Sequence, residues 1–582
     1  MLWEVTMSQT SKSADVSGQP TEVVPPAQAS ASQPSEPPRR TRSALSALVT
    51  LGIAGAVVVG LCVIPFPVLA GVPVALIVSP MAATSTRVCP GPLLSVQTRD
   101  GDATSFVPFQ APTIVDASTS EPITRSPLAV TGDTPGEGLT PIAVSAPPPA
   151  DGSPTLLAGA QAQTVAQDDM AGLAASGCLE PDAESWLVGG ATNLGQTTLI
   201  HLANGSGTDA SAHIEIYGEQ GRVAASGSND VVVPAGSEQV VSLASLAPDV
   251  TMPVVHVVTS GGSLAATLQQ TLVRSIVPSG VEFVEPGTNA NKTQVIPGVR
   301  LVNMAQFSDA EGGAVASDEE PAVRVLATSA QASDVVISTI ATDGTTTQVK
   351  STLAPGTVAQ LPFNNVPDGI YTVIVSGTTP VVAGVRSVVG AGVNPARTPV
   401  ASSATPTPGA SGNSSSKTPS PSRSSSAAPT PAAPAVGEPM DGIPLDGGEG
   451  VTADPGLSSG GSSANLVPLQ TGGDFTWYPA AAALGPTTLV AVASAPVAEL
   501  TLYNGLAKPV SALVHAEGQS DVNIVVDSGG VVSFEIAPNT VYRLDADAGL
   551  RAAVTYSGEG ESSASSVRPP SRLGSTILVY PR

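Results

Sequence analysis

A run of 21 residues without a charged side chain, 44–64 ("ALSALVTLGIAGAVVVGLCVI"), constrains the fold of this chain more than any other feature. As a helix it would be about 30 Å long, which is the thickness of the hydrocarbon core of a bilayer. Three arginines within 39–42 precede the run, and the next basic residue is Arg87. Because positive flanks stay in the cytoplasm, the pattern predicts one transmembrane span with a cytoplasmic N-terminus and an extracytoplasmic remainder.

A cleavable signal peptide is the alternative to this uncleaved anchor. Signal peptides carry a short charged region ahead of an apolar stretch of about 7–15 residues. Here 38 residues precede the arginines, and the apolar run continues, broken by prolines, to Val78. The sequence therefore favours a membrane anchor region over 43–79 behind a disordered cytoplasmic tail, 1–42. Whether translation begins at Met1 or Met7 stays open.

The bulk composition excludes one class of partner and favours small β domains. The chain of 582 residues has a net charge of −24, and no cluster of Lys and Arg follows Arg42. A phosphate-binding surface needs such a cluster, so we expect no nucleic-acid partner. Aromatic residues make up only 3% of the chain. Its cores must therefore be built from Val, Ala, Leu and Ile, which favour several small β domains.

Two cysteines, Cys89 and Cys178, follow the predicted span. In an oxidising compartment such a pair is expected to form a disulfide, and the alternatives of a reactive thiol or a metal-ligand pair lack a nearby histidine. We expect the bond to pin a strand within 80–98 onto the domain that begins near Cys178. The segment between them, 99–177, is rich in Thr, Ser, Pro and Gly and is predicted to be a disordered insertion.

Internal similarity organises the rest of the chain. Residues 202–220 match residues 502–520 at a constant offset of 300, with Asn204 opposite Asn504. Apolar residues alternate along both stretches, which is typical of half-buried strands that follow a turn. A weaker copy with the same order begins near 323. Copies of about 100 residues with turn signals every 8–12 residues are typical of antiparallel β-sandwiches.

The sequence thus predicts an all-β ectodomain of about three tandem Ig-like antiparallel β-sandwiches after one transmembrane helix, with long disordered segments. A Pro/Ser/Thr/Gly-rich linker, 394–470, cannot bury a core and is expected to detach the third domain from the first two. The sandwiches are placed at 178–288, 289–393 and 471–582.

No pattern typical of catalysis, cofactor binding or metal binding stands out. The chain has no nucleophile elbow, no H-E-x-x-H and no Walker A loop. Ser414 and Lys417 spell S-x-x-K, but inside the linker. His213 and Glu215 would share one strand face as two metal ligands, yet no third ligand is apparent. We therefore predict that the protein is not an enzyme and has no catalytic, cofactor-binding or metal-binding residues.

Exposed aromatic rings would indicate a sugar-binding face, because sugars stack on such rings. The candidates for ligand-facing rings are Trp186, Trp477 and Tyr478, with Tyr217 and Tyr503 as further candidates. A position in the core of a strand is the alternative for most of them.

The order of a Pro/Ser-rich head, one predicted span and a few short motifs allows a comparison with known families. The motifs are Cys89-Pro90 soon after the span, Cys178 followed by "WLVGGA" (186–191), and the L-x-N-G strand entry at 202–205. Together they resemble an actinobacterial family of uncharacterised single-pass membrane-anchored envelope proteins with β-rich ectodomains, over most of 40–582. The resemblance implies a domain of unknown function and no functional residues. It also implies a role in surface glycan assembly, since members are encoded close to envelope glycosyltransferase-type genes.

Three functions are compatible with these features. The leading hypothesis is a non-enzymatic, membrane-anchored, extracytoplasmic cell-envelope protein, a scaffold or adaptor that presents β-sandwich modules to an envelope protein or a cell-wall glycan. The alternative is a glycan-binding accessory subunit of an envelope glycosyltransferase system. An enzyme with a site assembled across domains is the third hypothesis, and buried, clustered Asp, Glu or His in a cleft would favour it.

Overall fold

The computed structural model describes most of the chain after the predicted anchor region, within one unit, Leu76–Val579. The predicted tail 1–42, the apolar run 44–64 and the predicted linker 394–470 lie outside the described residues. The described residues are 76–78, 82–99, 103–130, 138–167, 169–307, 320–363, 365–390, 473–547, 549–570 and 577–579.

The prediction of an all-β ectodomain is confirmed for the residues that the structure describes. In the described part of the chain, the helical elements are two single turns, α2 (Leu243–Leu246) and the 3-10 turn η1 (Met304–Phe307). No helix among those residues has the length and apolar character needed to cross a bilayer. Three residues of the predicted anchor region 43–79 are described, and they form the strand β1 (Leu76–Val78), antiparallel to β35 (Ile577–Val579).

The first module consists of two sheets that enclose one core, which includes Leu202, Ile214 and Leu268. Its strands alternate: in "ASAHIEIYG" (210–218) every second side chain is buried. One sheet has the order β11 (Glu184–Val188), β17 (Val254–Ser260), β13 (Ala210–Gly218), β14 (Gly221–Val223), with β15 (Val231–Val233) also paired to β13. The other has the order β19 (Val277–Val284), β18 (Ala265–Arg274), β12 (Gln196–Asn204), β16 (Ser237–Ser242), β7 (Ala129–Val130).

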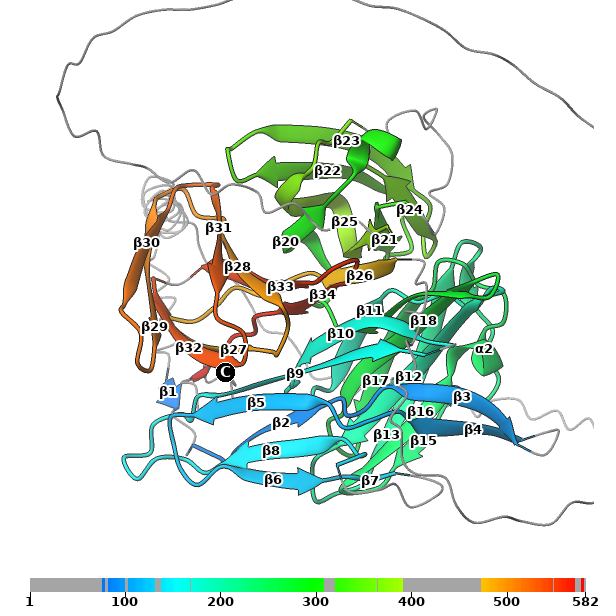
Figure 1. The fold of residues 1–582 in the computed structure, drawn as a ribbon, viewed down its shortest axis with the longest axis horizontal. Coiled ribbons are helices and arrows are strands. Elements are labelled where there is room, and N and C mark those ends of the chain that lie inside the picture. Colours follow the sequence, from blue (N-terminus) through cyan, green and yellow to red (C-terminus); the bar gives the residue numbers. More distant parts are fainter. Residues whose placement is uncertain are drawn as a thin grey trace, which may run out of the picture. The chain divides into compact units, whose positions relative to one another are not determined.

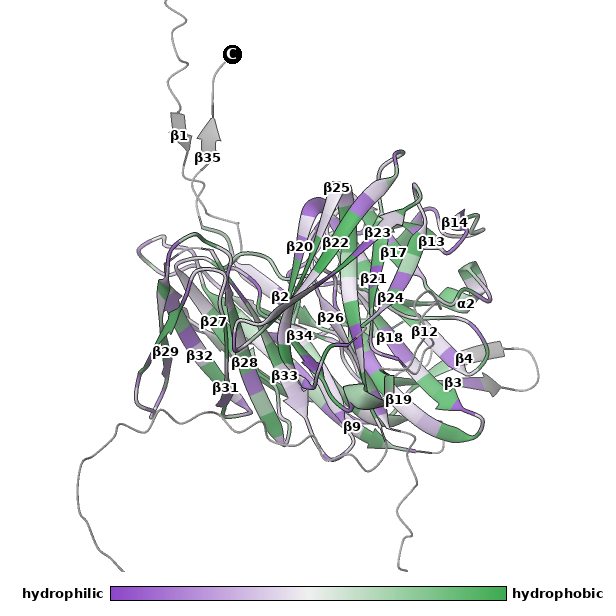
Figure 2. Cartoon of the chain, turned by 90° about the horizontal axis from the view of Figure 1, so that it is seen from above, coloured by the Kyte–Doolittle hydropathy of each residue, from purple (hydrophilic) through white to green (hydrophobic). Residues whose placement is uncertain are grey.

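The third module repeats this strand order around a core that includes Leu500, Val514 and Val554. Figure 2 shows hydrophobic and hydrophilic residues alternating along strands such as β28 and β29. One sheet has the order β27 (Thr487–Val492), β32 (Thr540–Ala546), β29 (Val510–Ala516), β30 (Val522–Val526). The other has the order β31 (Val531–Ile536), β28 (Val497–Asn504), β33 (Leu550–Ser557), β34 (Ser562–Ser566).

The repeat extends to single hydrogen bonds. The side-chain amide of Asn204 donates to the carbonyls of Thr208 and Val233 at 2.8 and 3.0 Å. The amide of Asn504 donates to the equivalent carbonyls, of Lys508 and Val526, at 2.8 and 2.9 Å. Both asparagines are buried, so each ties its strand to the turn that follows and to the partner sheet.

The second module has the same order, but a single long strand, β25 (Gly369–Val389), joins its two sheets. The first half of β25 pairs with β20 and β22, and its second half pairs with β21 and β26. The full order is β23 (Thr346–Leu353), β22 (Ser333–Ala341), β25, β21 (Ala322–Ala327), β24 (Val358–Pro362), with β20 (Asn291–Leu301) and β26 (Asp474–Pro479) also on β25.

This pairing corrects two expectations. The strand β26 follows the predicted linker, yet it pairs with β25 and completes the second module (Figure 1). It takes the place that β19 has in the first module and β34 in the third. Residues 394–470 therefore interrupt the second module before its last strand instead of separating two domains. The prediction that they detach the third domain is wrong, and so is the boundary at 471.

The N-terminal layer, 85–177, corrects a third expectation. Residues 99–177 were predicted to be disordered, but where they are described they contain strands β4 to β10. Ala160, Ala162 and Leu173 lie in the core of the third module. The small side chains of the two alanines allow close packing, so burial rather than composition orders this segment. The sheets are β10 (Ala171–Gly177), β9 (Leu157–Ala166), β5 (Thr113–Ser118); β2 (Ser85–Cys89), β8 (Ile142–Ala146), β6 (Thr124–Pro127); and β3 (Leu94–Arg99), β4 (Ala103–Pro108).

Candidate functional site

Four edge strands from four different sheets meet inside the described unit. They are β10 of the N-terminal layer and β19, β26 and β34, the last strands of the three modules. β10 and β26 each lie against both β19 and β34. An edge strand presents unpaired backbone N–H and C=O groups, which need partners once they are buried. We call this meeting place the four-strand junction.

Asp474, on β26, supplies partners to the other three strands. Its Oδ2 accepts hydrogen bonds from the backbone N–H groups of Leu173 and Ser562, at 3.0 and 3.1 Å. Its Oδ1 accepts from Val281 and Phe475, at 3.3 and 2.9 Å. Burial raises the pKa of Asp474 well above its usual range, while these amide hydrogen bonds act in the opposite direction. One carboxyl group thus joins four sheets.

Two glycines make room for this carboxyl group. A Cβ atom on Gly172 would lie 2.7 Å from Oδ1 of Asp474. A Cβ atom on Gly280 would lie 2.4 Å from the Phe475 ring and 2.8 Å from the same oxygen. Both glycines also have positive φ angles, of 136° and 133°, which disfavour other residues. At these two positions a side chain would collide with Asp474 or with Phe475, so only glycine fits there.

Two more buried acids complete the junction. Glu285 accepts hydrogen bonds from the N–H groups of Gly177 (2.6 Å) and Ser566 (3.1 Å) and from Nη2 of Arg568 (3.2 Å). Oε1 of Glu282 accepts from the Ser563 hydroxyl at 2.7 Å, whereas its Oε2 is buried without a partner. Burial raises the pKa of Glu282 well above its usual range; the Ser563 hydrogen bond opposes this and the charge of Asp474 adds to it.

These acids are buried and clustered, as an enzyme site across domains would require, but the oxygens of Asp474 and Glu285 are occupied by structural hydrogen bonds. All four hydrogen bonds to Asp474 come from backbone amides. Glu285 accepts hydrogen bonds from two backbone amides and from the guanidinium group of Arg568. The arrangement therefore satisfies strand edges and fixes modules to one another. A sequence signal existed in "GVEFVEPG" (280–287), where two acids interrupt an apolar strand.

Arg324 forms a second connection between modules. Its Nη1 donates to the carbonyls of Gly190 and Pro253 in the first module, at 2.8 and 3.0 Å. Its Nε and Nη2 donate to Oε1 of Gln360. Burial, and to a lesser degree the charge of Arg386, lowers the pKa of Arg324 well below its usual range. Five donors in a fixed plane reach several segments at once, as only arginine can.

The three predicted ligand-facing rings are buried, which corrects that expectation. Trp477 is 1% exposed and donates its indole N–H to Oε1 of Gln270 at 2.7 Å. Tyr478 is 1% exposed, and its hydroxyl oxygen accepts from the Arg300 N–H at 3.3 Å. Trp186 is 5% exposed and stacks on the ring of His256, with centroids 3.7 Å apart. None of the three lines an exposed sheet face, because each fills a space between modules or sheets.

His213 and Glu215 do lie together, but Glu215 is engaged elsewhere. Nε2 of His213 is 3.6 Å from Oε1 of Glu215, while Arg222 is 2.7 Å from that oxygen. Burial alone would raise the pKa of Glu215, but hydrogen bonds from His256 and Tyr217 and the charge of Arg222 lower it below its usual range. No group of three metal-ligating side chains occurs among the residues that the structure describes.

The predicted disulfide between Cys89 and Cys178 is present. It holds β2 against the start of the first module, where Val88 and Leu179 exchange backbone hydrogen bonds of 2.7 and 2.8 Å. The strand in 80–98 is thus pinned as expected.

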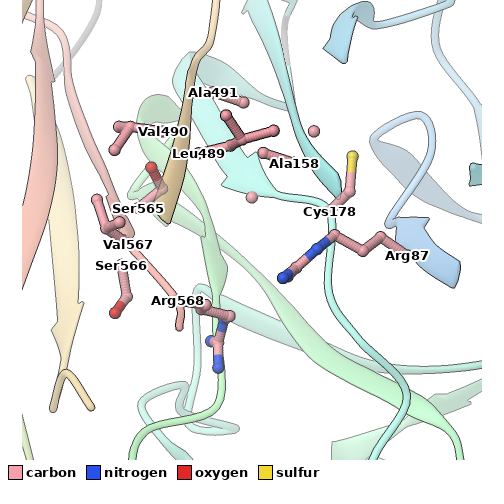
Figure 3. A pocket seen from close by; sticks show the side chains of 12 residues that line it. Arg87, Ala158, Cys178, Leu489, Val490, Ala491, Ser565, Ser566, Val567 and Arg568 are labelled. Atoms are coloured by element: carbon pink, nitrogen blue, oxygen red, sulfur yellow. The ribbon is translucent and has the colours of Figure 1, made fainter. Parts of the chain in front are cut away.

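A cleft of about 30 Å³ lies between the disulfide and β34, beside the junction. Figure 3 shows the Arg87 guanidinium directed from the disulfide side toward Arg568. Other lining residues include Leu489, Ala491 and Ser566. Burial lowers the pKa of Arg87, Glu180 raises it, and the neighbouring charge of Arg568 lowers it further. The cleft brings two cations together in a chain with net charge −24.

A family model described as a family of unknown function, DUF5719, matches residues 130–441. No curated protein and no solved structure matches the chain. The matched range includes two strands of the four-strand junction, β10 and β19, and ends before β26 and β34.

Proposed function

The chain belongs to DUF5719, a family of unknown function whose model spans 130–441, and we propose that it is a non-enzymatic scaffold or adaptor of the cell envelope. In this proposal a single N-terminal span anchors it in the membrane, and its β modules work outside the cell as one rigid body.

The four-strand junction is the observation that carries the proposal. A scaffold fixes the distance between its binding faces, so its modules must not move independently. Asp474 accepts amide hydrogen bonds from β10, β19 and β34 at the same time. Removing one partner of a buried polar network leaves the others unsatisfied, so the connected modules separate only at high cost.

The membrane anchor and the module type rest on further features. The apolar run 44–64 behind the arginines of 39–42 supports a single span with a cytoplasmic N-terminus. For the modules we propose tandem Ig-like β-sandwiches, because antiparallel sheets enclose one core in each repeat. The resemblance to actinobacterial envelope proteins supports an envelope protein or a wall glycan as partner.

The glycan-binding alternative has less support. It calls for aromatic rings on an exposed sheet face, and Trp186, Trp477 and Tyr478 are buried. A glycan partner would therefore have to bind through other groups.

The test is a pull-down from crosslinked cells with the tagged full-length chain as bait. A tagged fragment of residues 1–81 serves as control, since it contains the predicted span but no module. A scaffold should recover a specific envelope protein, or wall polymer, only with the full-length bait. Equal recovery by the fragment would assign binding to the tail or span and contradict the proposal.

Cell fractionation tests the anchor separately. The full-length chain should sediment with membranes, and protease added to intact cells with a permeabilised wall should digest 82–582 but spare an N-terminal tag. A tag that is digested, or a chain recovered in the soluble fraction, would contradict the predicted topology.

A further inference from the structure

Arg87 is buried, and the structure uses only some of its N–H donors. Its side chain donates from Nε to the Leu157 carbonyl at 2.5 Å and from Nη2 to the Pro569 carbonyl at 3.4 Å. The residue is only 6% exposed. A guanidinium has five N–H donors, so three of them are not used by these contacts. Glu180 is the carboxylate whose charge acts on Arg87.

Arg568, on the other side of the cleft, also has an unused hydrogen-bond donor. Its Nη2 donates to Oε2 of Glu285 and to the Pro286 carbonyl, at 3.2 and 2.8 Å. Its Nε–H is buried and has no partner. A buried donor without an acceptor costs about 1–3 kcal/mol in proteins, and Arg568 is one of the residues that line the cleft.

Two guanidinium groups and two carboxylates set the charge around the cleft. Glu285 forms an ion pair with Arg568, and the charge of Glu180 favours the charged form of Arg87. Two waters would fill a volume of about 30 Å³, but they would bring no charge to the two guanidinium groups. An oxyanion with one negative charge would accept charge-assisted hydrogen bonds from both.

We propose that the cleft between Arg87 and Arg568 binds a single oxyanion, the carboxylate or the singly charged phosphate group of a ligand. The volume admits only this head group, and the rest of the ligand would lie outside, past lining residues that are only half-buried, such as Ala491 and Ser566. The lining residues come from the N-terminal layer, the disulfide and the third module. Ligand binding would therefore stabilise the packing of these parts against one another. This inference does not depend on the proposed scaffold function.

The test measures the thermal stability of the full-length chain in detergent, with acetate and inorganic phosphate as separate probes at constant ionic strength. A specific oxyanion should raise the melting temperature by about 2 °C or more at saturation. A shift with acetate alone indicates a carboxylate ligand, and a shift with phosphate alone indicates a phosphate ligand.

Two variants show whether the shift arises in the cleft. Ala491→Glu places a carboxylate at the rim, where it can occupy the site itself, and should remove the shift while keeping the fold. Arg568→Lys keeps a cation beside Glu285 but removes the Nε–H, and should weaken binding of either probe at least tenfold. Arg543→Lys, a control at an exposed ion pair, should respond like the unaltered chain.

Two results would overturn the proposal. One is the absence of any shift with either probe in the unaltered chain. The other is a shift of the same size in Ala491→Glu and in the unaltered chain, because the anion would then bind elsewhere.

Discussion

The guanidinium carbon of Arg324 lies 4.5 Å from the centre of the Trp477 ring. Arg324 belongs to the second module, and Trp477 lies on the strand that completes that module while its ring packs into the core of the first. A cation over an aromatic face is attracted by the ring, most strongly when both are shielded from water. This contact therefore joins two modules and the strand that follows 394–470.

Arg324→Lys tests this connection. A lysine cannot reach the Gly190 and Pro253 carbonyls and Gln360 together, so buried acceptors lose their donors. We expect the free energy of unfolding to fall by about 1–3 kcal/mol for each buried acceptor left without a donor, measured as a lower denaturant midpoint by tryptophan fluorescence. Arg543→Lys, at a half-exposed position, is the control, and equal midpoints for the two variants would contradict the prediction.

Asp474→Asn tests the four-strand junction. The carboxamide has the size of the carboxyl group, but its NH₂ must face two of the four backbone N–H groups that now donate to Asp474. We expect a loss of about 2–4 kcal/mol in the free energy of unfolding, measured by denaturant titration. Asp527→Asn, on an exposed turn, should leave it unchanged. A neutral effect of Asp474→Asn would mean that the junction does not depend on the carboxyl group.

Glu282→Gln tests the pH dependence of stability. Burial raises the pKa of Glu282 in the folded protein, so folding favours the protonated acid. Its stabilising contribution is complete below the ordinary glutamate pKa of about 4.3 and is lost as pH rises through the raised pKa. Glutamine stays neutral, so the variant should gain stability relative to the unaltered chain as pH rises from about 4 to 8. Melting curves across this range measure the difference, and parallel curves would refute the prediction. Glu517→Gln, at an exposed position, is the control.

Replacing both cysteines, Cys89→Ser with Cys178→Ser, should destabilise the chain by about 2–5 kcal/mol, because the bond closes a large loop, with a sequence separation of 89. The melting temperature should fall to that of the reduced chain. Reductant should then have no further effect on the double variant. If it lowered the melting temperature of both proteins equally, the loss would not come from this bond.

A protease site inserted within 394–470 tests whether β26 and the third module are held to the rest of the chain by packing and strand pairing. After cleavage the two fragments should stay together in native size-exclusion chromatography, because β26 pairs with β25 along six residues, Asp474 to Pro479. They should separate in denaturant. Fragments that separate without denaturant would show that the covalent connection, and not the sheet, holds them together.

Sequence reasoning found what is encoded locally. The alternation around Asn204 and Asn504 predicted matching strands, and the buried hydrogen bonds of both asparagines agree. The disulfide followed from two cysteines in one compartment. The strands of 99–177 were missed because Ala, Gly, Thr and Pro carry little local signal, although Ala160 and Ala162 are fully packed in a core.

The candidate site was not predictable in the same way. Glu282, Asp474 and Arg87 stand far apart in the sequence, and although the acids of 280–287 interrupt an apolar stretch, nothing in the sequence indicates which residues meet them. Their structural role depends on which strand edges lie next to them in the folded chain.

By itself, the sequence determined the β character of the chain, the repeated module and the covalent bond between Cys89 and Cys178, because alternation, turn residues and cysteine number act within a few residues. Only the tertiary structure decided that β26, which follows 394–470, completes the second module, which precedes that segment. It also decided that three buried acids join four sheets. The physical reason is that buried edge strands must find hydrogen-bond partners wherever the folded chain provides them, at any distance along the sequence.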